Sequence, residues 1–83
     1  MKVIGEKRLK EFCRKHADAR SRIDAWRCEA EDAAWKSFHD IKARFNSASQ
    51  LSGNRVVFNI RGNKYRLVVH VSYKMQIVQV LNA

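Results

Sequence analysis

The spacing of apolar residues changes once along the chain, close to residue 55. Before residue 46, apolar side chains recur every three or four positions, as they do on one face of a helix. These stripes predict helices over about residues 6–16, 18–34 and 37–45, the second with Asp18 as its N-cap. From Arg55 onward, apolar and polar side chains alternate, which is the period of a strand with one buried face.

The alternating part predicts three strands, over about residues 55–61, 65–71 and 76–81. Residues 2–4 can form a short first strand, and the polar residues 46–54 are expected to form a loop. Helices followed by strands favour an α+β fold, in which N-terminal helices pack on a small antiparallel sheet. At 83 residues we expect one domain with a thin core.

The turn signal at Gly62-Asn63 allows the two faces of the predicted hairpin to be assigned. If these two residues form the loop, Asn59 opposes Arg66 and Arg55 opposes His70, and such cross-strand partners share a face. One face is then apolar and packs on the helices. The other face carries Arg55, Val57, Asn59, Arg61, Lys64, Arg66, Val68 and His70.

Charge is distributed unevenly between the two halves of the chain. There are 17 Lys and Arg against 8 Asp and Glu, a formal net charge of +9. Every acid lies at or before Asp40, so the sheet half carries cations only. Cations on one sheet face repel each other unless an anion binds between them, which favours phosphate binding by this Arg-rich face. The alternative is an ordinary solvated basic surface without an anionic partner.

The residues of this face restrict its chemistry. A two-metal nuclease needs clustered carboxylates, which the sheet half lacks, so we expect neither a metal nor another cofactor. Metal-free RNA cleavage remains, in which the ribose 2′-OH attacks the adjacent phosphorus while Arg and Lys stabilise the developing charge. His70 and Tyr73 are the nearest candidates for proton transfer, with a purely structural role left open for His70.

The sequence also indicates where the protein works. Cys13 and Cys28 are too few to suggest a disulfide framework. No apolar stretch approaches the ~20 residues of a transmembrane helix, and the charged N-terminus lacks the apolar segment of a signal peptide. We therefore expect a cytoplasmic protein with no membrane partner.

Two stretches of the sequence, residues 40–48 and 54–69, closely resemble the HigB toxin family, within the RelE-like ribosome-dependent endoribonucleases. The similarity includes the surroundings of Trp26 and Trp35 and extends to about Val80. It implies a RelE-like microbial ribonuclease fold and cleavage of mRNA on the ribosome. It also implies neutralisation by a HigA-type antitoxin with a helix-turn-helix domain, with operator DNA bound only through the toxin–antitoxin complex.

The resemblance assigns roles to individual residues. The stretch Tyr65-Arg66-Leu67-Val68 resembles a strand whose arginine contacts the scissile phosphate, so the resemblance implies a catalytic role for Arg66. Arg61 resembles the basic position on the preceding strand, and His70 and Tyr73 complete the catalytic candidates. We further expect RNA contacts from Arg55, Asn59, Lys64, Lys42 and Arg44.

One departure from the family pattern keeps a second interpretation open. HigB toxins of this type usually continue past the last strand with a segment that bears His and Tyr, whereas this chain stops at Ala83. The alternative is therefore a truncated, non-catalytic relative that binds antitoxin or ribosome without cutting RNA. A DNA-binding subunit of a repressor complex ranks last, because the sequence contains no recognition-helix pattern.

Overall fold

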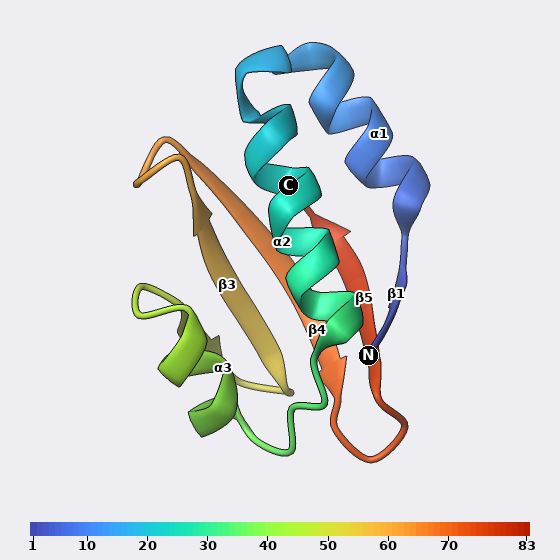
Figure 1. Cartoon of the computed structure of the whole chain (residues 1–83), viewed down its shortest axis with the longest axis vertical. Helices are drawn as coiled ribbons and strands as arrows, with labels where there is room; N and C mark the ends of the chain where they lie inside the picture. The colour runs from blue at the N-terminus through green and yellow to red at the C-terminus, as the bar shows by residue number, and fades with distance from the viewer.

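The computed structural model describes residues 1–83 and places three α-helices on one face of a five-stranded sheet (Figure 1). This arrangement confirms the predicted α+β class. The elements in chain order are β1 (Lys2–Ile4), α1 (Glu6–Lys15), the 3-10 turn η1 (Ala17–Ala19), α2 (Arg20–Asp32), α3 (Phe38–Arg44), β2 (Ser49–Leu51), β3 (Arg55–Ile60), β4 (Tyr65–Ser72) and β5 (Ile77–Asn82).

The strands lie in the order β1-β5-β4-β3-β2 across the sheet. The four strands from β2 to β5 pair antiparallel with one another, and the predicted register of the β3–β4 hairpin is confirmed. β1 runs parallel to β5, so the complete sheet is mixed. β2 lies inside the predicted loop of residues 46–54. Its three residues are all exposed, and the hydrophobic alternation that reveals the other strands is therefore missing.

Aromatic rings fill the core between the helices and the sheet. The ring of Phe58 in β3 lies 5.4 Å from that of Trp26 in α2 and 5.1 Å from that of Phe45, just after α3, measured between centroids. Trp35, between α2 and α3, stacks on the same phenyl ring at 6.2 Å. Both tryptophans are buried, which agrees with the core role expected for them.

The N-terminal segment is fixed against the sheet by Gly5 and by the α-amino group of Met1. Gly5 joins β1 to α1 with φ +92°, and a Cβ at this position would lie 3.0 Å from Val80 Cβ, so glycine is favoured on both counts. The α-amino group donates hydrogen bonds to the carbonyls of Ala30 and Glu31, both at 2.9 Å, near the end of α2. No helix of the fold is both long enough and apolar enough to span a membrane.

The start of the second helix differs from the prediction. Asp18 lies in η1, α2 begins at Arg20, and no side chain forms an N-capping hydrogen bond to α2. The Asp18 carboxylate instead reaches the hairpin between β3 and β4. This contact between distant segments changes the predicted interface.

Candidate nucleic-acid interface

We define the outer face as the surface of β3 and β4 that is turned away from the helices. Along β3 and β4 the residues of the opposite, core-facing side are buried except for the half-buried Tyr65, and those between them are exposed or half-buried. No strand carries an acidic residue, so this face has no carboxylate. The outer face consists of Arg55, Val57, Asn59, Arg66, Val68 and His70, with Ser72 at the end of β4.

The outer face contains two polar cross-strand pairs with an apolar pair between them. Asn59 pairs with Arg66 next to the hairpin turn, and Arg55 pairs with His70 at the other end of β3. Val57 and Val68 form the pair in the middle and are half-buried. The two polar pairs are four residues apart along each strand, which corresponds to about 13 Å at about 3.3 Å per residue.

Arg66 is the outer-face cation that is left free to bind an anion. Its side chain is exposed and makes no hydrogen bond or ion pair within the molecule. Arg55 donates from Nε to the Ser52 carbonyl at 3.0 Å, and Asn59 donates from Nδ2 to the Ser47 carbonyl at 3.3 Å. These contacts orient Arg55 and Asn59, whereas the Arg66 guanidinium has no hydrogen-bond partner within the protein.

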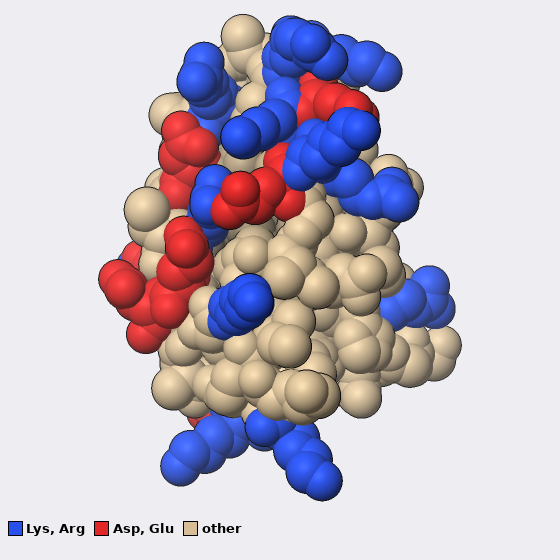
Figure 2. Space-filling view, turned by 90° about the vertical axis from the view of Figure 1, so that its right-hand side faces the viewer, with Lys and Arg blue, Asp and Glu red and all other residues tan.

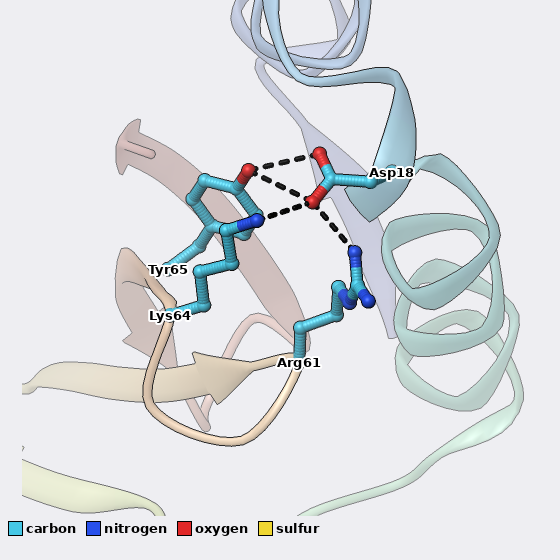
Figure 3. A network of polar contacts seen from close by, with 4 residues as sticks. All are labelled: Asp18, Arg61, Lys64 and Tyr65. Atoms are coloured by element: carbon cyan, nitrogen blue, oxygen red, sulfur yellow. Dashed lines mark hydrogen bonds and ion pairs between the residues drawn. The ribbon is translucent and has the colours of Figure 1, made fainter.

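Arg61 and Lys64 do not lie on the outer face, so the prediction that they share a face with Arg66 is wrong. The strand pairing ends at Ile60 and Tyr65, and Arg61 takes a left-handed backbone conformation with φ +54°. The alternation of side chains holds only for extended backbone, so it does not extend into this turn. Both cations point toward the helices and bind Asp18 (Figure 3).

The contacts of Asp18 form a compact polar network. Its Oδ2 accepts hydrogen bonds from Arg61 Nη1 at 2.6 Å and from Lys64 Nζ at 2.9 Å, and its Oδ1 accepts one from Tyr65 Oη at 2.8 Å (Figure 3). The bonds from Lys64 and Tyr65 hold the pKa of Asp18 well below its ordinary value. The Tyr65 ring also packs against the rings of Phe12 and His16, which fixes the hairpin to α1.

Tyr73 is separated from the outer-face residues, in contrast to the expectation that it joins His70 in proton transfer. It lies in the turn after β4 and packs against the core. Its hydroxyl is buried without a hydrogen-bond partner, and burial together with the nearby Asp40 carboxylate raises the pKa of this phenol. Of the two predicted proton-transfer residues, only His70 lies on the same face of the sheet as Arg66, four residues further along β4.

Lys42 and Arg44 also lie outside the outer face. Both belong to α3, which packs on the helix side of the sheet through Ile41 and Phe45. Lys42 Nζ donates to the Ala48 carbonyl at 3.0 Å. Arg44 forms a bidentate ion pair with Glu29, and the hydrogen bonds of this pair raise the pKa of Arg44 and lower that of Glu29. In the structure both predicted RNA-contact residues therefore lie away from the outer face and bind groups of the protein itself.

A pocket of about 280 Å³ at the edge of β3 was not predicted from the sequence. Trp26, Phe45 and Phe58 give it an apolar lining. Its polar lining comes from both sides of the sheet and from the helices: Asn59, Arg61, Arg22, Arg44 and Glu29. Helical spacing in the sequence gives no signal for Arg22, because the pocket exists only once α2 packs beside the hairpin.

Basic side chains are also abundant away from the sheet. Figure 2 shows Lys and Arg gathered over the end of the molecule where α1 lies, with Asp and Glu among them. Arg27, for example, is paired with both Glu6 and Glu31. The outer face differs from this surface because it has no acid to neutralise its cations.

A comparison with known protein families finds a match over most of the chain. A family model described as HigB_toxin, the RelE-like toxic component of a toxin–antitoxin system, matches residues 19–82. No individual curated protein matches the chain. The matched segment includes α2, α3 and all the strands of the outer face. The chain therefore belongs to the HigB family of RelE-like toxins, the toxic components of toxin–antitoxin systems.

Proposed function

We propose that this toxin is a metal-free endoribonuclease that cleaves mRNA on the ribosome. The observation that carries the proposal is the free Arg66 guanidinium beside Asn59 on a sheet face without carboxylates. Arg presents several donors in a rigid fork, which suits bidentate contact with a phosphate. Membership of a RelE-like toxin family supports the same activity.

In the proposed mechanism, an RNA strand lies along the outer face. Arg66 holds the non-bridging oxygens of the scissile phosphate and stabilises their charge as the adjacent 2′-OH attacks phosphorus. Val57 and Val68 offer an apolar surface to a ribose or base between the two polar pairs. DNA lacks the attacking 2′-OH, so cleavage is specific to RNA.

His70 supplies the proton-transfer group of this mechanism. The imidazole ring has nitrogens that accept or donate a proton, so it is able to accept the proton of the 2′-OH or donate one to the leaving oxygen. Its Cα lies about 13 Å from that of Arg66, so the two side chains must extend toward each other over Val68 to act at one phosphate. Arg55, which pairs with His70, and Asn59 contribute contacts to neighbouring parts of the RNA.

The family implies an antitoxin as a partner, and we propose that this antitoxin is of the HigA type, with a helix-turn-helix domain. The toxin then contacts operator DNA only through the complex. Neutralisation requires the antitoxin to deny RNA access to the outer face, either by covering it or by blocking approach to the ribosome.

The test is cleavage of mRNA in a translation extract by the purified 83-residue chain, with the 5′ ends of the mRNA mapped. Arg66→Ala is expected to slow cleavage by about 10²-fold or more, the usual effect of removing a donor to a developing oxyanion. Arg14→Ala removes an exposed arginine of α1 and is the matched control. Equal cleavage by the Arg66 variant and the Arg14 variant would refute the role of Arg66.

A second candidate function is binding to the ribosome or antitoxin without RNA cleavage. It is favoured by the position of Tyr73, because the outer face then has a single proton-transfer residue, His70. Under this alternative, the chain binds ribosomes and the 5′ ends of the mRNA are the same with and without it. New 5′ ends that depend on Arg66 would exclude it.

A further inference from the structure

The hairpin between β3 and β4 presents three different donors to a single anion (Figure 3). A guanidinium from Arg61, an ammonium from Lys64 and a phenol from Tyr65 all bind the Asp18 carboxylate, with donor–acceptor distances of 2.6, 2.9 and 2.8 Å. Charge-assisted donors of these types are the groups with which proteins bind phosphate. All four side chains are at the surface, and that of Lys64 is 57% exposed.

We propose that Arg61, Lys64 and Tyr65 form a second phosphate-binding site, in which Asp18 acts as a built-in competitor. The ligand is a phosphate of an RNA strand that continues from the outer face around the hairpin, so the identity of the ligand rests on the proposed function. When RNA binds, a phosphate replaces the carboxylate. One anion is exchanged for another, and the three donors keep an acceptor.

The backbone of the hairpin supports this assignment. Arg61 has φ +54°, a conformation that residues other than glycine rarely adopt and that is enriched at functional sites when the surrounding structure enforces it. Gly62, the next residue, also has a positive φ. The turn thus holds Arg61 away from the outer face, on which strand alternation would have placed it, and directs it to the shared anion.

The second site is within reach of the first. Tyr65 directly precedes Arg66 in β4, so the two sites are adjacent in the chain and lie on opposite sides of the sheet. Asn59 of the outer face and Arg61 line the same pocket at the edge of β3. An RNA strand bound at Arg66 therefore has a short path around this edge to the Asp18 network.

The built-in competitor explains why an extended strand is the expected ligand and inorganic phosphate is not. A group tethered in the same molecule competes at an effective concentration of about millimolar or more. A free phosphate ion must therefore be present at a comparable concentration to displace the carboxylate. A phosphate in a strand that is already held at Arg66 competes on equal terms, because its own tether raises its local concentration.

The first experiment compares Asp18→Asn with Asp24→Asn. Both substitutions remove one negative charge from the helical half, but Asp24 makes no ion pair in the structure. Binding of a short single-stranded RNA is measured at several salt concentrations. We expect Asp18→Asn to tighten binding roughly 3- to 10-fold at low salt and to steepen the log–log salt slope by roughly 1, because two cations are released for phosphate contacts. Asp24→Asn is expected to change affinity less than about 2-fold.

Double substitutions locate the effect. In the Asp18→Asn background, adding Arg61→Ala or Lys64→Ala is expected to remove the gain in affinity. In the same background, inorganic phosphate is expected to bind and to compete with the RNA, whereas in the unmodified protein it is not. An Asp18→Asn variant that binds RNA no better than Asp24→Asn, although thermal denaturation shows it folded, would overturn the proposal.

A measurement on the unmodified protein keeps the proposal testable if the Asp18 variant does not fold. The side-chain NMR signals of Arg61 and Lys64 are expected to shift saturably as a six-nucleotide RNA is added. Signals that stay fixed while that of Arg66 moves would contradict the second site. A shift caused by an oligo-glutamate peptide but not by RNA would also contradict it and would favour an acidic protein partner.

These readouts separate the second site from the proposed function. If Arg66→Ala retains full cleavage, the proposed role of Arg66 fails. That result does not decide the second site, because the gain in RNA affinity of Asp18→Asn is measured by binding and not by cleavage. If Asp18→Asn has no effect on binding but Arg66→Ala abolishes cleavage, the second site fails and the proposed function stands.

Discussion

The hydroxyl of Tyr65 donates a hydrogen bond to the carboxylate of Asp18, which lies 47 residues earlier in the chain, at 2.8 Å. This contact joins the first residue of β4 to the turn before α2. It also decides which cations of the hairpin are available to a ligand, since the same carboxylate binds Arg61 and Lys64. The balance of charge around the sheet therefore depends on one acid of the helical half.

Asp18 is expected to make folding stability depend on pH in the acid range. Its pKa in the folded protein is depressed below the ordinary 3.8, so its contribution is present above that value and is lost as pH falls through the folded pKa. Urea denaturation at pH 7, 4 and 3 is expected to show a smaller acid loss for Asp18→Asn than for the unmodified chain. Asp24→Asn removes an acid that makes no ion pair, so this variant should lose as much stability at acid pH as the unmodified chain does.

Gly5→Ala is expected to destabilise the fold by more than about 1 kcal/mol, because alanine is strained at positive φ and its Cβ would collide with Val80. Gly53→Ala is the matched control, since Gly53 also has a positive φ, +71°, but nothing lies within 4 Å of its Cβ position. The difference in unfolding free energy between the two variants measures the steric contact. Equal losses would show that β1 and β5 readily move apart.

Phe58→Ala is expected to cost about 3–5 kcal/mol, as large-to-small changes of buried aromatic residues do. The ring contacts Trp26, Trp35 and Phe45, so its loss opens a cavity between all the layers of the core. For a domain of this size, each 1 kcal/mol lowers Tm by roughly 4–8 °C. Met75→Ala, at a position that is 69% exposed, is the control and should leave Tm nearly unchanged.

Tyr73→Phe is expected to leave stability unchanged or to raise it slightly, because the substitution removes a buried hydroxyl that has no hydrogen-bond partner. It should also leave mRNA cleavage unchanged, since the phenol does not face Arg66. His70→Gln, by contrast, is expected to slow cleavage by about 10²–10⁴-fold, the usual contribution of a general acid or base. A severe loss of cleavage in the Tyr73 variant would show that the phenol takes part after all.

The salt dependence of RNA binding is expected to separate Arg66 from Arg44. Arg66→Ala should weaken binding and reduce the log–log salt slope by about 0.7, the value for one phosphate contact on a single strand. Arg44→Ala should leave the slope unchanged, because Arg44 is already bound to Glu29. The reverse result would place the RNA on α3 and not on the outer face.

Sequence patterns alone were enough to predict the three helices, the strands other than β2 and the register of the central hairpin. Its two hydrophobic periods separate the helices from the strands, and two strands with one buried face can pair in few ways. Asn59–Arg66 and Arg55–His70 were predictable as pairs for this reason. The absence of acids after Asp40 was equally visible and leaves the outer face without carboxylates.

Which cations share a surface depends on how distant segments pack. Alternation is a property of extended backbone, so it assigns faces within β3 and β4 but not in the turn, where Arg61 adopts a left-handed conformation. The packing of η1 and α2 then brings Asp18 to that turn from a distant part of the sequence. Local patterns carry no information on such contacts, because they form only when separate elements pack together.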